Sequence, residues 1–388
     1  MKKSLSRQLN GRAFKKEPLK IAHLHVWDKK NKGDVAIVLA VQELLNKKFP
    51  GCQINDFPVS LLKNVGVMAK GAIADRQLMI KKINQADLVV IGGGGIFYSY
   101  FLPFNRDVVE AIKRPIVLFG VGYIREVDAP KLSREAARSV VALVKKAKAV
   151  GVRDNNTKRF LVKNGVSAKK IEVIGDPAAL LTEKKPKIAT LRKLGLARPN
   201  KKIKIGLNLN YSGWLGFGKW QEDILKAYQE AAEYFLKKYG GSGGSGREAD
   251  KTGAQFYYLK HHPGENKIYP ELKIKDLRVV DLRPAEQKYV YGQMDLVIGM
   301  MLHAGVLAFG AEAPEISVAY DLRNYSFAEF IGCPELVVDL DKLKKGELLR
   351  RAKLVFKEKR IYRRKFILKD QEIFQKQAKF IRKINSVI

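Results

Sequence analysis

The chain has 388 residues, of which 73 are Lys or Arg and 39 are Asp or Glu, so its formal net charge is +34. This length suggests two domains, and a hydrophobic content of 46% is enough to build real cores, which excludes a disordered or fibrous protein. The two cysteines, Cys52 and Cys333, lie far apart, which excludes a disulfide scaffold and a zinc site of the CxxC type.

Neither a signal peptide nor a membrane span is predicted. The basic N-terminus lacks the apolar stretch of a secretory signal. Residues 88–105 carry no charge and have the length of a span, but they include four consecutive glycines and Pro103. This run therefore predicts a buried strand followed by a glycine loop, and we expect a cytoplasmic protein.

Short apolar runs alternate with amphipathic stretches in the first half of the chain. Strands are predicted at residues 19–26, 53–57, 88–91, 116–119, 149–152 and 171–173, with helices at residues 34–48, 69–84, 104–113, 131–146 and 155–164. This alternation is typical of a parallel sheet covered by helices on both faces. Residues 1–185 are therefore predicted to form a Rossmann-like domain, and the charged, proline-containing residues 186–202 to form a linker.

A second series of the same kind predicts a second Rossmann-like domain at residues 203–341. Its strands are expected at residues 203–209, 255–260, 278–280, 296–298 and 315–319, and its helices at residues 221–238, 285–291 and 302–309. The predicted fold class is α/β, with two doubly wound domains facing a cleft, and ligands bind beyond the carboxyl ends of such strands. Residues 240–246 read GGSGGSG, the composition of a flexible and engineered linker, and carry no functional prediction.

Residues 342–388 are predicted to form a basic amphipathic helical tail. They contain 17 Lys or Arg and 4 Asp or Glu, with apolar residues every three to five positions. One interpretation is a terminal helix packed on the body with solvated lysines, and another is attraction to an anionic membrane surface. Nucleic acid is a third polyanion, but no DNA- or RNA-binding signature is present, so no specific nucleic-acid partner is expected.

Polar and glycine residues collect where predicted strands end. Asn31 and Asp34 flank a tight turn at a helix start, where Asp34 suits either an N-cap or the orientation of an acceptor hydroxyl. Glycines allow a ligand to approach the main chain closely. Two such glycine stretches follow neighbouring strands: Gly92, Gly93, Gly94 and Gly95, and then Gly120 and Gly122.

Cationic residues follow other strand ends. Arg153 suits either an ion pair with its neighbour or an anion. Lys260 and His262 stand at a strand end that is open to an anion, and His303 lies between a strand and an apolar helix. The histidines His23 and His25 share one strand face and are expected to have structural roles, so no metal site is predicted.

These motifs in this order resemble the polysaccharide pyruvyltransferase family, over about residues 21–332. The motifs that carry the resemblance are Asn31-x-Gly33-Asp34-x-Ala36-Ile37, Asp87 with the four glycines, Gly120-x-Gly122, Val152-Arg153-Asp154, Leu302-His303-Ala304 and Tyr320-Asp321-x-Arg323. The resemblance implies an architecture similar to that of GT-B glycosyltransferases. It also implies transfer of a pyruvyl group from phosphoenolpyruvate onto a sugar of a cell-surface glycan, as a ketal.

The resemblance also guides the choice of site residues. Phosphoenolpyruvate carries a phosphate and a carboxylate, for which Arg153 and Arg323 are the expected cations, with Lys260 a weaker third. His303 is the expected proton donor and Asp34 the residue that acts on the acceptor hydroxyl. The wider set expected to bind substrate comprises His262, Asn31, Gly93, Gly94 and Gly95.

Two positions depart from the family pattern. Met301 stands where the family commonly has an arginine, and Arg323 replaces a lysine while keeping its charge. Met301 leaves room for a second hypothesis, a GT-B transferase that uses a nucleotide sugar or another phosphorylated donor. A third hypothesis is a basic scaffold without enzymatic activity that binds acidic glycan or membrane.

The partners that follow from the resemblance are phosphoenolpyruvate as co-substrate and a glycan or lipid-linked oligosaccharide as acceptor, with no cofactor and no metal. Because surface glycans are often assembled on lipid carriers, the resemblance also fits a peripheral position at the inner face of the cell membrane.

Overall fold

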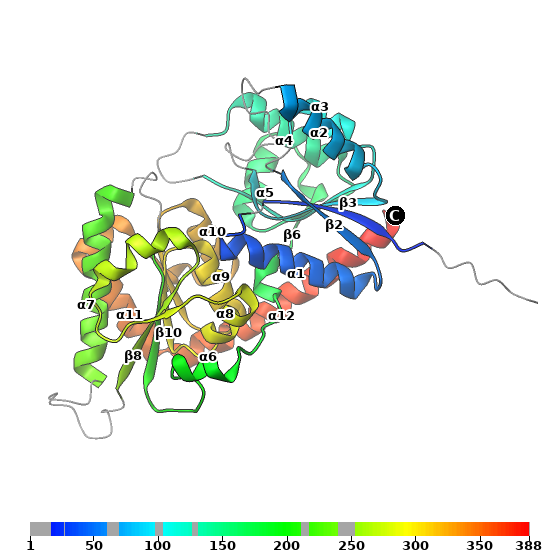
Figure 1. Ribbon diagram of the computed structural model, residues 1–388. Helices are drawn as coiled ribbons and strands as arrows, with labels where there is room; N and C mark the ends of the chain where they lie inside the picture. Colours follow the sequence, from blue (N-terminus) through cyan, green and yellow to red (C-terminus); the bar gives the residue numbers. More distant parts are fainter. Residues whose placement is uncertain are drawn as a thin grey trace, which may run out of the picture.

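The computed structural model describes residues 17–26, 28–59, 70–97, 104–125, 131–210, 217–239 and 253–387. Within these residues the chain forms two six-stranded sheets, each covered by helices (Figure 1). Every strand pair is parallel. The predicted α/β fold with two doubly wound domains is therefore confirmed.

The first sheet has the strand order β2-β1-β3-β4-β5-β6. Its strands are β1 (Lys20–His25), β2 (Gln53–Pro58), β3 (Leu88–Phe97), β4 (Ile116–Tyr123), β5 (Ala149–Val152) and β6 (Ile171–Val173). The helices between them are α1 (Lys32–Lys48), α2 (Lys70–Ile83), α3 (Arg106–Ala111), α4 (Arg134–Lys146) and α5 (Asn155–Lys163). The central strands β3 and β4 are buried almost throughout, which explains their continuous apolar sequence.

The second sheet has the strand order β12-β11-β10-β7-β8-β9. Its strands are β7 (Ile203–Leu207), β8 (Ala254–Leu259), β9 (Arg278–Val280), β10 (Leu296–Gly299), β11 (Glu315–Ala319) and β12 (Val337–Asp339). Its helices are α7 (Gln221–Tyr239), α8 (Pro284–Tyr291), α9 (Leu302–Gly310) and α10 (Leu322–Phe330), and α6 (Ile188–Lys193) precedes β7 in the chain. Three of these elements, α6, α10 and β12, were not predicted from the sequence.

Both glycine stretches lie within strands, and the prediction that they form loops is wrong. Strand β3 continues through Gly92–Gly95 to Phe97, and β4 continues through Gly120 and Gly122 to Tyr123. Gly93, Gly94 and Gly120 have φ values of 72°, 81° and 65°, and the pairing register shifts beside them. Glycine is favoured here because these backbone conformations are costly for a residue with a side chain.

Two apolar cores hold the molecule together. One face of the first sheet, including Ile21 and Val90, packs on Ile37 and Val41 of α1, and this core continues into the second domain. The opposite face, which includes Leu24, packs against α2 and α4 in a separate core. Because the first core is continuous across both domains, burial of apolar surface fixes their relative placement.

The C-terminal residues are helical and are packed along both domains. They form α11 (Glu347–Lys357) and α12 (Lys359–Lys383), and Figure 1 shows α12, in red, running from the second domain to the first. An ion pair of 2.6 Å joins Lys359 Nζ to Asp295 at the start of α12, and one of 2.8 Å joins Lys383 Nζ to Glu172 at its end. No helix among the described residues is long and apolar enough to cross a bilayer.

Candidate active site

The N-terminus of α1, from the first domain, lies directly against α9, from the second. Asn31 caps α1, because its Oδ1 accepts a 2.9 Å hydrogen bond from the Gly33 backbone nitrogen. A Cβ added at Gly33 would lie 2.2 Å from His303 Nδ1, so only glycine lets the imidazole approach this closely. His303 stands in the first turn of α9 and is 6% exposed. The sequence motif at residues 31–34 thus brings His303 to the start of α1.

Asp176 contacts two of the predicted site residues. Its Oδ2 lies 3.7 Å from His303 Nε2 and 3.4 Å from Arg153 Nη1. Burial favours the neutral acid, but the contact with His303 and the charges of His303 and Arg153 outweigh it and lower the pKa of Asp176. At 3.7 Å the Asp176 carboxylate is an ion-pair neighbour of His303 and not a hydrogen-bond partner, and it places a negative charge beside both the imidazole and the guanidinium.

Arg153 is a buried arginine with unused donor capacity. It follows β5, is 3% exposed and is held by Asp154 at 3.3 Å as well as by Asp176. A Cβ at Gly122 would lie 2.5 Å from Arg153 Nη2, which explains why a glycine stands at the end of β4. Within the described residues, Nη2 has no hydrogen-bond partner. A buried guanidinium with an unsatisfied N–H group is suited to binding an anionic ligand.

Asp34 lies in the electrostatic field of the same cations. Burial raises its pKa to about 7, with a further contribution from the charge of Asp28, while Arg323 and Arg153 act in the opposite direction. A carboxyl group with a pKa near neutrality can accept and return a proton under ordinary conditions. Asp34 is therefore chemically suited to act on a hydroxyl group.

Arg323 lies at the start of α10 and is held by its own motif. Its Nε donates a 2.6 Å hydrogen bond to Asp321 Oδ2, and its Nη2 donates a 3.0 Å bond to the Tyr320 hydroxyl. Asp321 is fully buried and also caps α10 through the Arg323 backbone nitrogen. The next residue, Asn324, donates to the Met300 carbonyl at 3.0 Å, which ties the start of α10 to the start of α9.

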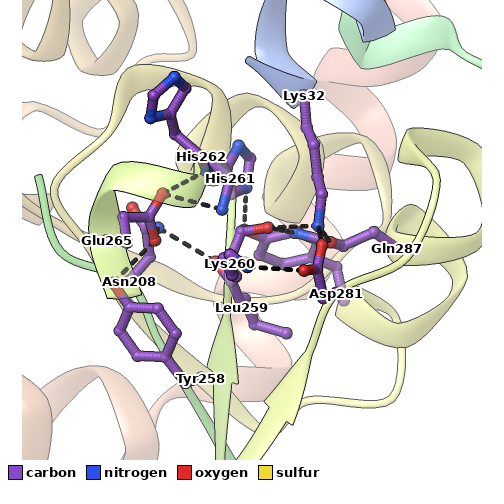
Figure 2. Close-up of polar contacts among 11 residues, drawn as sticks. Lys32, Asn208, Tyr258, Leu259, Lys260, His261, His262, Glu265, Asp281 and Gln287 are labelled. Carbon is purple, nitrogen blue, oxygen red and sulfur yellow. Dashed lines mark hydrogen bonds and ion pairs between the residues drawn. The ribbon is translucent and has the colours of Figure 1, made fainter. Parts of the chain in front are cut away.

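Lys260 is already engaged in an ion pair with Asp281 of its own domain, and Lys32 joins the same carboxylate from the other domain. Its Nζ lies 2.7 Å from Asp281 Oδ2, and Lys32 of α1 reaches the other oxygen of Asp281 at 2.8 Å. Lys32 Nζ also donates to the Lys260 carbonyl at 2.6 Å and to Gln287 Oε1 at 2.8 Å (Figure 2). Because Asp281 neutralises part of this charge, an anion at Lys260 would have to compete with that carboxylate.

The loop after β8 carries His262 and is organised by Glu265. Figure 2 shows the Glu265 carboxylate facing the backbone nitrogens of His261 and His262, which donate to it at 2.9 Å and 2.6 Å. The Tyr258 hydroxyl donates to its other oxygen at 2.7 Å. His262 Nε2 lies 3.5 Å from Asp28, so this ring also spans the two domains.

The predicted glycine ligands have a packing explanation. A Cβ at Gly93 would lie 1.7 Å from Ile37 Cγ2, and a Cβ at Gly95 would lie 1.6 Å from Ile124 Cδ1. At Gly94 the left-handed backbone conformation itself favours glycine. Gly93 and Gly94 let Ile37 of α1 pack closely on β3, and Gly95 makes room for Ile124. The predicted contact of these glycines with substrate stays a prediction.

The arrangement separates the predicted residues into two groups. His303 and Arg153 both contact Asp176 beside the start of α1, and the charges of Arg153 and Arg323 act on Asp34. Lys260 and His262 instead lie with Lys32 in the contact between the domains. Sequence reasoning missed Asp176 and Lys32. Asp176 could have been predicted, because it follows β6 closely and other candidate site residues also follow strands. No local sequence pattern would have identified Lys32.

Comparisons with known proteins address the family and the fold. The sequence profile described as polysaccharide pyruvyl transferase matches residues 31–321, ending two residues before Arg323. No curated protein sequence matches the chain.

Solved structures with a similar fold share little sequence with this chain. Anabaena Alr3699/HepE in complex with UDP and glucose is 13% identical, with a TM-score of 0.57 over 95% of this chain and 98% of that one. The S. aureus MnaA-UDP co-structure is 12% identical, with a TM-score of 0.56 over 90% of each chain. Methanocaldococcus jannaschii UDP-GlcNAc 2-epimerase with UDP-GlcNAc and UDP is 13% identical, with a TM-score of 0.51 over 87% of this chain and 93% of that one.

At this identity the solved structures establish a GT-B-like fold, as expected, and nothing about the reaction. The profile match covers most of the chain, and the protein therefore belongs to the polysaccharide pyruvyl transferase family.

Proposed function

We propose that the protein transfers the pyruvyl group of phosphoenolpyruvate to a sugar of a cell-surface polysaccharide or of its lipid-linked precursor, forming a pyruvyl ketal. The observation that carries this proposal is the contact of His303, from one domain, with Asp176 and the start of α1, from the other, beside Arg153. Membership of the family supports the reaction class. The reaction needs phosphoenolpyruvate as co-substrate and no other cofactor.

Two arginines match the two anionic groups of phosphoenolpyruvate. Arg153 has an Nη2 group without a hydrogen-bond partner in the described structure, and Arg323 presents a guanidinium fixed by Asp321 and Tyr320. A forked guanidinium suits both carboxylates and phosphates. In the proposed complex these two side chains bind the carboxylate and the phosphate and orient the enol carbon toward His303.

His303 is the proposed acid for the first step. A proton moves from the imidazolium to the methylene carbon of phosphoenolpyruvate, which becomes a methyl group, and the substituted carbon becomes an oxocarbenium-like centre. Asp176 stays ionised beside His303, because its pKa is lowered. A positioned acid of this type contributes about 100-fold to 10,000-fold to a rate.

Two hydroxyl groups of the acceptor complete the ketal. The first attacks the cationic carbon and gives its proton to the Asp34 carboxylate, whose pKa of about 7 suits that exchange. The second attacks the same carbon as the phosphate leaves, and its proton returns to the neutral His303 imidazole. The products are the ketal and inorganic phosphate. His303 is again protonated at this point, and Asp34 returns to its carboxylate form by releasing its proton to the departing phosphate or to solvent.

The direct test is to incubate the full-length protein with phosphoenolpyruvate and candidate glycan acceptors. A ketal product is expected by mass spectrometry, with release of one phosphate per pyruvyl group. His303→Asn and Arg153→Gln should each lower turnover about 100-fold or more while remaining folded. Turnover within about threefold of wild type in both folded variants would remove these residues from the proposed site.

A nucleotide-sugar donor is the second candidate, favoured by one observation. Met301 stands just before α9, at the position where the family commonly has an arginine, so one cation for the donor is missing. Solved structures of the same fold contain UDP or a UDP-sugar. Thermal shifts measured with phosphoenolpyruvate and with UDP-sugars separate the two candidates, because a donor that binds the native state raises the melting temperature.

We also propose that the protein works at an anionic membrane surface, where lipid-linked acceptors are held. The support is the outer face of α12, a solvent-exposed stripe at helical spacing that consists of Arg360, Ile361, Arg364, Leu368, Lys379 and Arg382. Ile361 and Leu368 are 55% and 63% exposed, and the four cations of this face form no ion pair with a described residue. Exposed apolar side chains beside unpaired cations are typical of lipid contact.

A further inference from the structure

We propose that His23, His25 and Asp56 form a binding site for a zinc-class divalent cation, separate from the pyruvyl-transfer site. His23 and His25 are two residues apart on β1, so their side chains lie on the same face of the sheet. Asp56 stands on the neighbouring strand β2, directly opposite His23 in the register. Strand pairing therefore brings the two histidines together with a carboxylate that lies more than 30 positions further along the chain.

The distances suit a first-row metal ion. Asp56 Oδ1 lies 3.3 Å from His25 Nε2 and 3.6 Å from His23 Nδ1, and no two ligand atoms of the three residues are more than 4.8 Å apart. A tetrahedral zinc ion with bonds of about 2.0–2.1 Å holds its ligand atoms about 3.3 Å apart. Small side-chain rotations are enough to convert the observed arrangement into such a set.

Burial of His23 gives independent support. Its side chain is fully buried, and its ring nitrogens form no hydrogen bond of good geometry, because Nδ1 lies 3.6 Å from Asp56 Oδ1 and the other polar neighbour is the backbone at Gly92. A weakly satisfied buried nitrogen is costly, and a metal ion at the Asp56 side would bind Nδ1 directly. Gly92 supports the arrangement, because a Cβ there would lie 2.8 Å from His23 Nε2 and would displace the ring.

The Asp56 carboxylate supplies negative charge to the site and is reached from solvent. The Asp56 side chain is 45% exposed, so an ion can reach it from solvent. Gln42 of α1 donates a 2.7 Å hydrogen bond to Asp56 Oδ1, which is the kind of outer contact that orients a metal ligand. Two imidazoles and one carboxylate favour Zn²⁺ over Mg²⁺ or Ca²⁺, with water as the fourth ligand.

The expected role of the ion is to fasten an exposed edge of the first sheet. Strand β2 is an edge strand that pairs with β1 alone among the described strands, and most of its residues are exposed or half-buried. An ion held by both strands would tie β2 to the sheet. This role does not depend on the proposed reaction.

The test measures metal content and affinity in the untagged full-length protein. After treatment with a chelator and dialysis, wild-type protein is expected to bind one Zn²⁺ per chain by calorimetry and elemental analysis. Bound Co²⁺ should show the visible absorption of a four-coordinate ion. Asp56→Asn should weaken Zn²⁺ binding at least about tenfold and abolish the Zn²⁺-dependent rise in melting temperature.

Asp28→Asn is the matched control, because the Asp28 carboxylate is 47% exposed and also lies beside a histidine, at 3.5 Å from His262 Nε2. It should bind Zn²⁺ as wild type does. The proposal is overturned if wild-type protein binds no stoichiometric Zn²⁺, or if Asp28→Asn and Asp56→Asn lose binding equally. In the first outcome the three residues share protons instead of a metal, and in the second the bound ion is a surface contaminant.

Discussion

At the scale of single residues, Asp176 links the acid of the proposed reaction to its anion-binding arginine. It is fully buried between His303 and Arg153, and its lowered pKa keeps it ionised. A charge placed in this way acts on both neighbours, because removing it leaves His303 without its buried anionic neighbour and Arg153 with Asp154 as its remaining carboxylate partner.

Asp176→Asn should therefore lower kcat by about 100-fold and also raise the KM for phosphoenolpyruvate. Asp154→Asn is the matched comparison, because that carboxylate contacts Arg153 at 3.3 Å and no contact with His303 is seen in the described structure. We expect it to raise KM with a much smaller loss of kcat. Steady-state kinetics of both variants provide the test, and equal losses of kcat would contradict a specific link between Asp176 and His303.

A second residue, Glu315, makes a prediction about stability. Glu315 is on β11, and burial raises its pKa from 4.5 to about 8. Its Oε1 has no hydrogen-bond partner among the described residues, and a Cβ at Gly305 of α9 would lie 3.2 Å from its carboxyl group. The folded protein therefore binds a proton at Glu315 that the unfolded chain releases near pH 4.5.

The resulting stabilisation is complete below pH 4.5 and is lost progressively as the pH rises toward 8, by about 1.4 kcal/mol per pH unit at most. Glu315→Gln keeps the shape of the neutral acid and has no proton to lose. Melting curves between pH 5 and 8 should show wild type losing stability relative to this variant. A constant difference across that range would show that Glu315 does not titrate there.

At the scale of elements, the start of α1 against the start of α9 is the contact on which the proposed site depends. A Cβ at Gly33 would lie 2.2 Å from His303 Nδ1 and 2.5 Å from its Cγ, so a side chain there would push the imidazole away from α1. Gly33→Ala should lower kcat/KM by about 100-fold, since a displacement of about 1 Å is enough for such a loss. Gly218→Ala, at a position with nothing within 4 Å, is the control and should keep full activity.

Helix α12 is the element that connects the two domains. Phe380 near its end is fully buried, and its ring centroid lies 5.7 Å from that of Phe119 in the first sheet. Phe380→Ala should lower the free energy of unfolding by about 3–5 kcal/mol. Phe374→Ala on the same helix removes a ring that is 47% exposed, and we expect it to lower the free energy of unfolding by less than about 1 kcal/mol. Urea denaturation of both variants tests this, and similar losses would contradict the connecting role of α12.

Most elements were predictable from the sequence because their apolar residues repeat with strand or helix periodicity. Strands β5 and β6 have the predicted bounds, whereas β12 is only three residues long and α6 lies in a charged segment, so neither has a readable period. The site residues that could be predicted are those that directly follow a strand, because the carboxyl ends of parallel strands meet at one edge of a sheet. The approach of Lys32 to Asp281, or of Gly33 to His303, depends on how two domains pack, and no local pattern encodes it.

At the scale of the whole molecule, the charge of +34 and the position of α12 bear on the membrane proposal. Residues 342–387 form amphipathic helices whose inner apolar residues, such as Phe366 and Ile373, are buried against the body. This agrees with the interpretation of a terminal helix packed on the body. Deleting this segment would therefore remove part of the core, and a truncated protein could not report on lipid binding. The outer face of α12 is the part that is free to contact a membrane.

Neutralising the outer face of α12 should release the protein from anionic vesicles without affecting its fold. The variant replaces four cations of that face with Gln: Arg360, Arg364, Lys379 and Arg382. A charge-matched control replaces four exposed cations near α6 with Gln: Arg192, Lys193, Arg198 and Lys201. Each cation near an anionic surface contributes about 1 kcal/mol, so removing four should weaken sedimentation with phosphatidylglycerol vesicles at least tenfold at low salt.

The control distinguishes binding through the outer face of α12 from a general attraction that depends only on the net positive charge. Both variants lose the same net charge, so a general attraction of a basic protein would weaken equally in the two. Retained binding in the control, and loss in the α12 variant, would show that the orientation of α12 matters. In that orientation the exposed Ile361 and Leu368 would reach the lipid headgroups, and their replacement by Ser should weaken the binding that persists at high salt, where ionic attraction is screened.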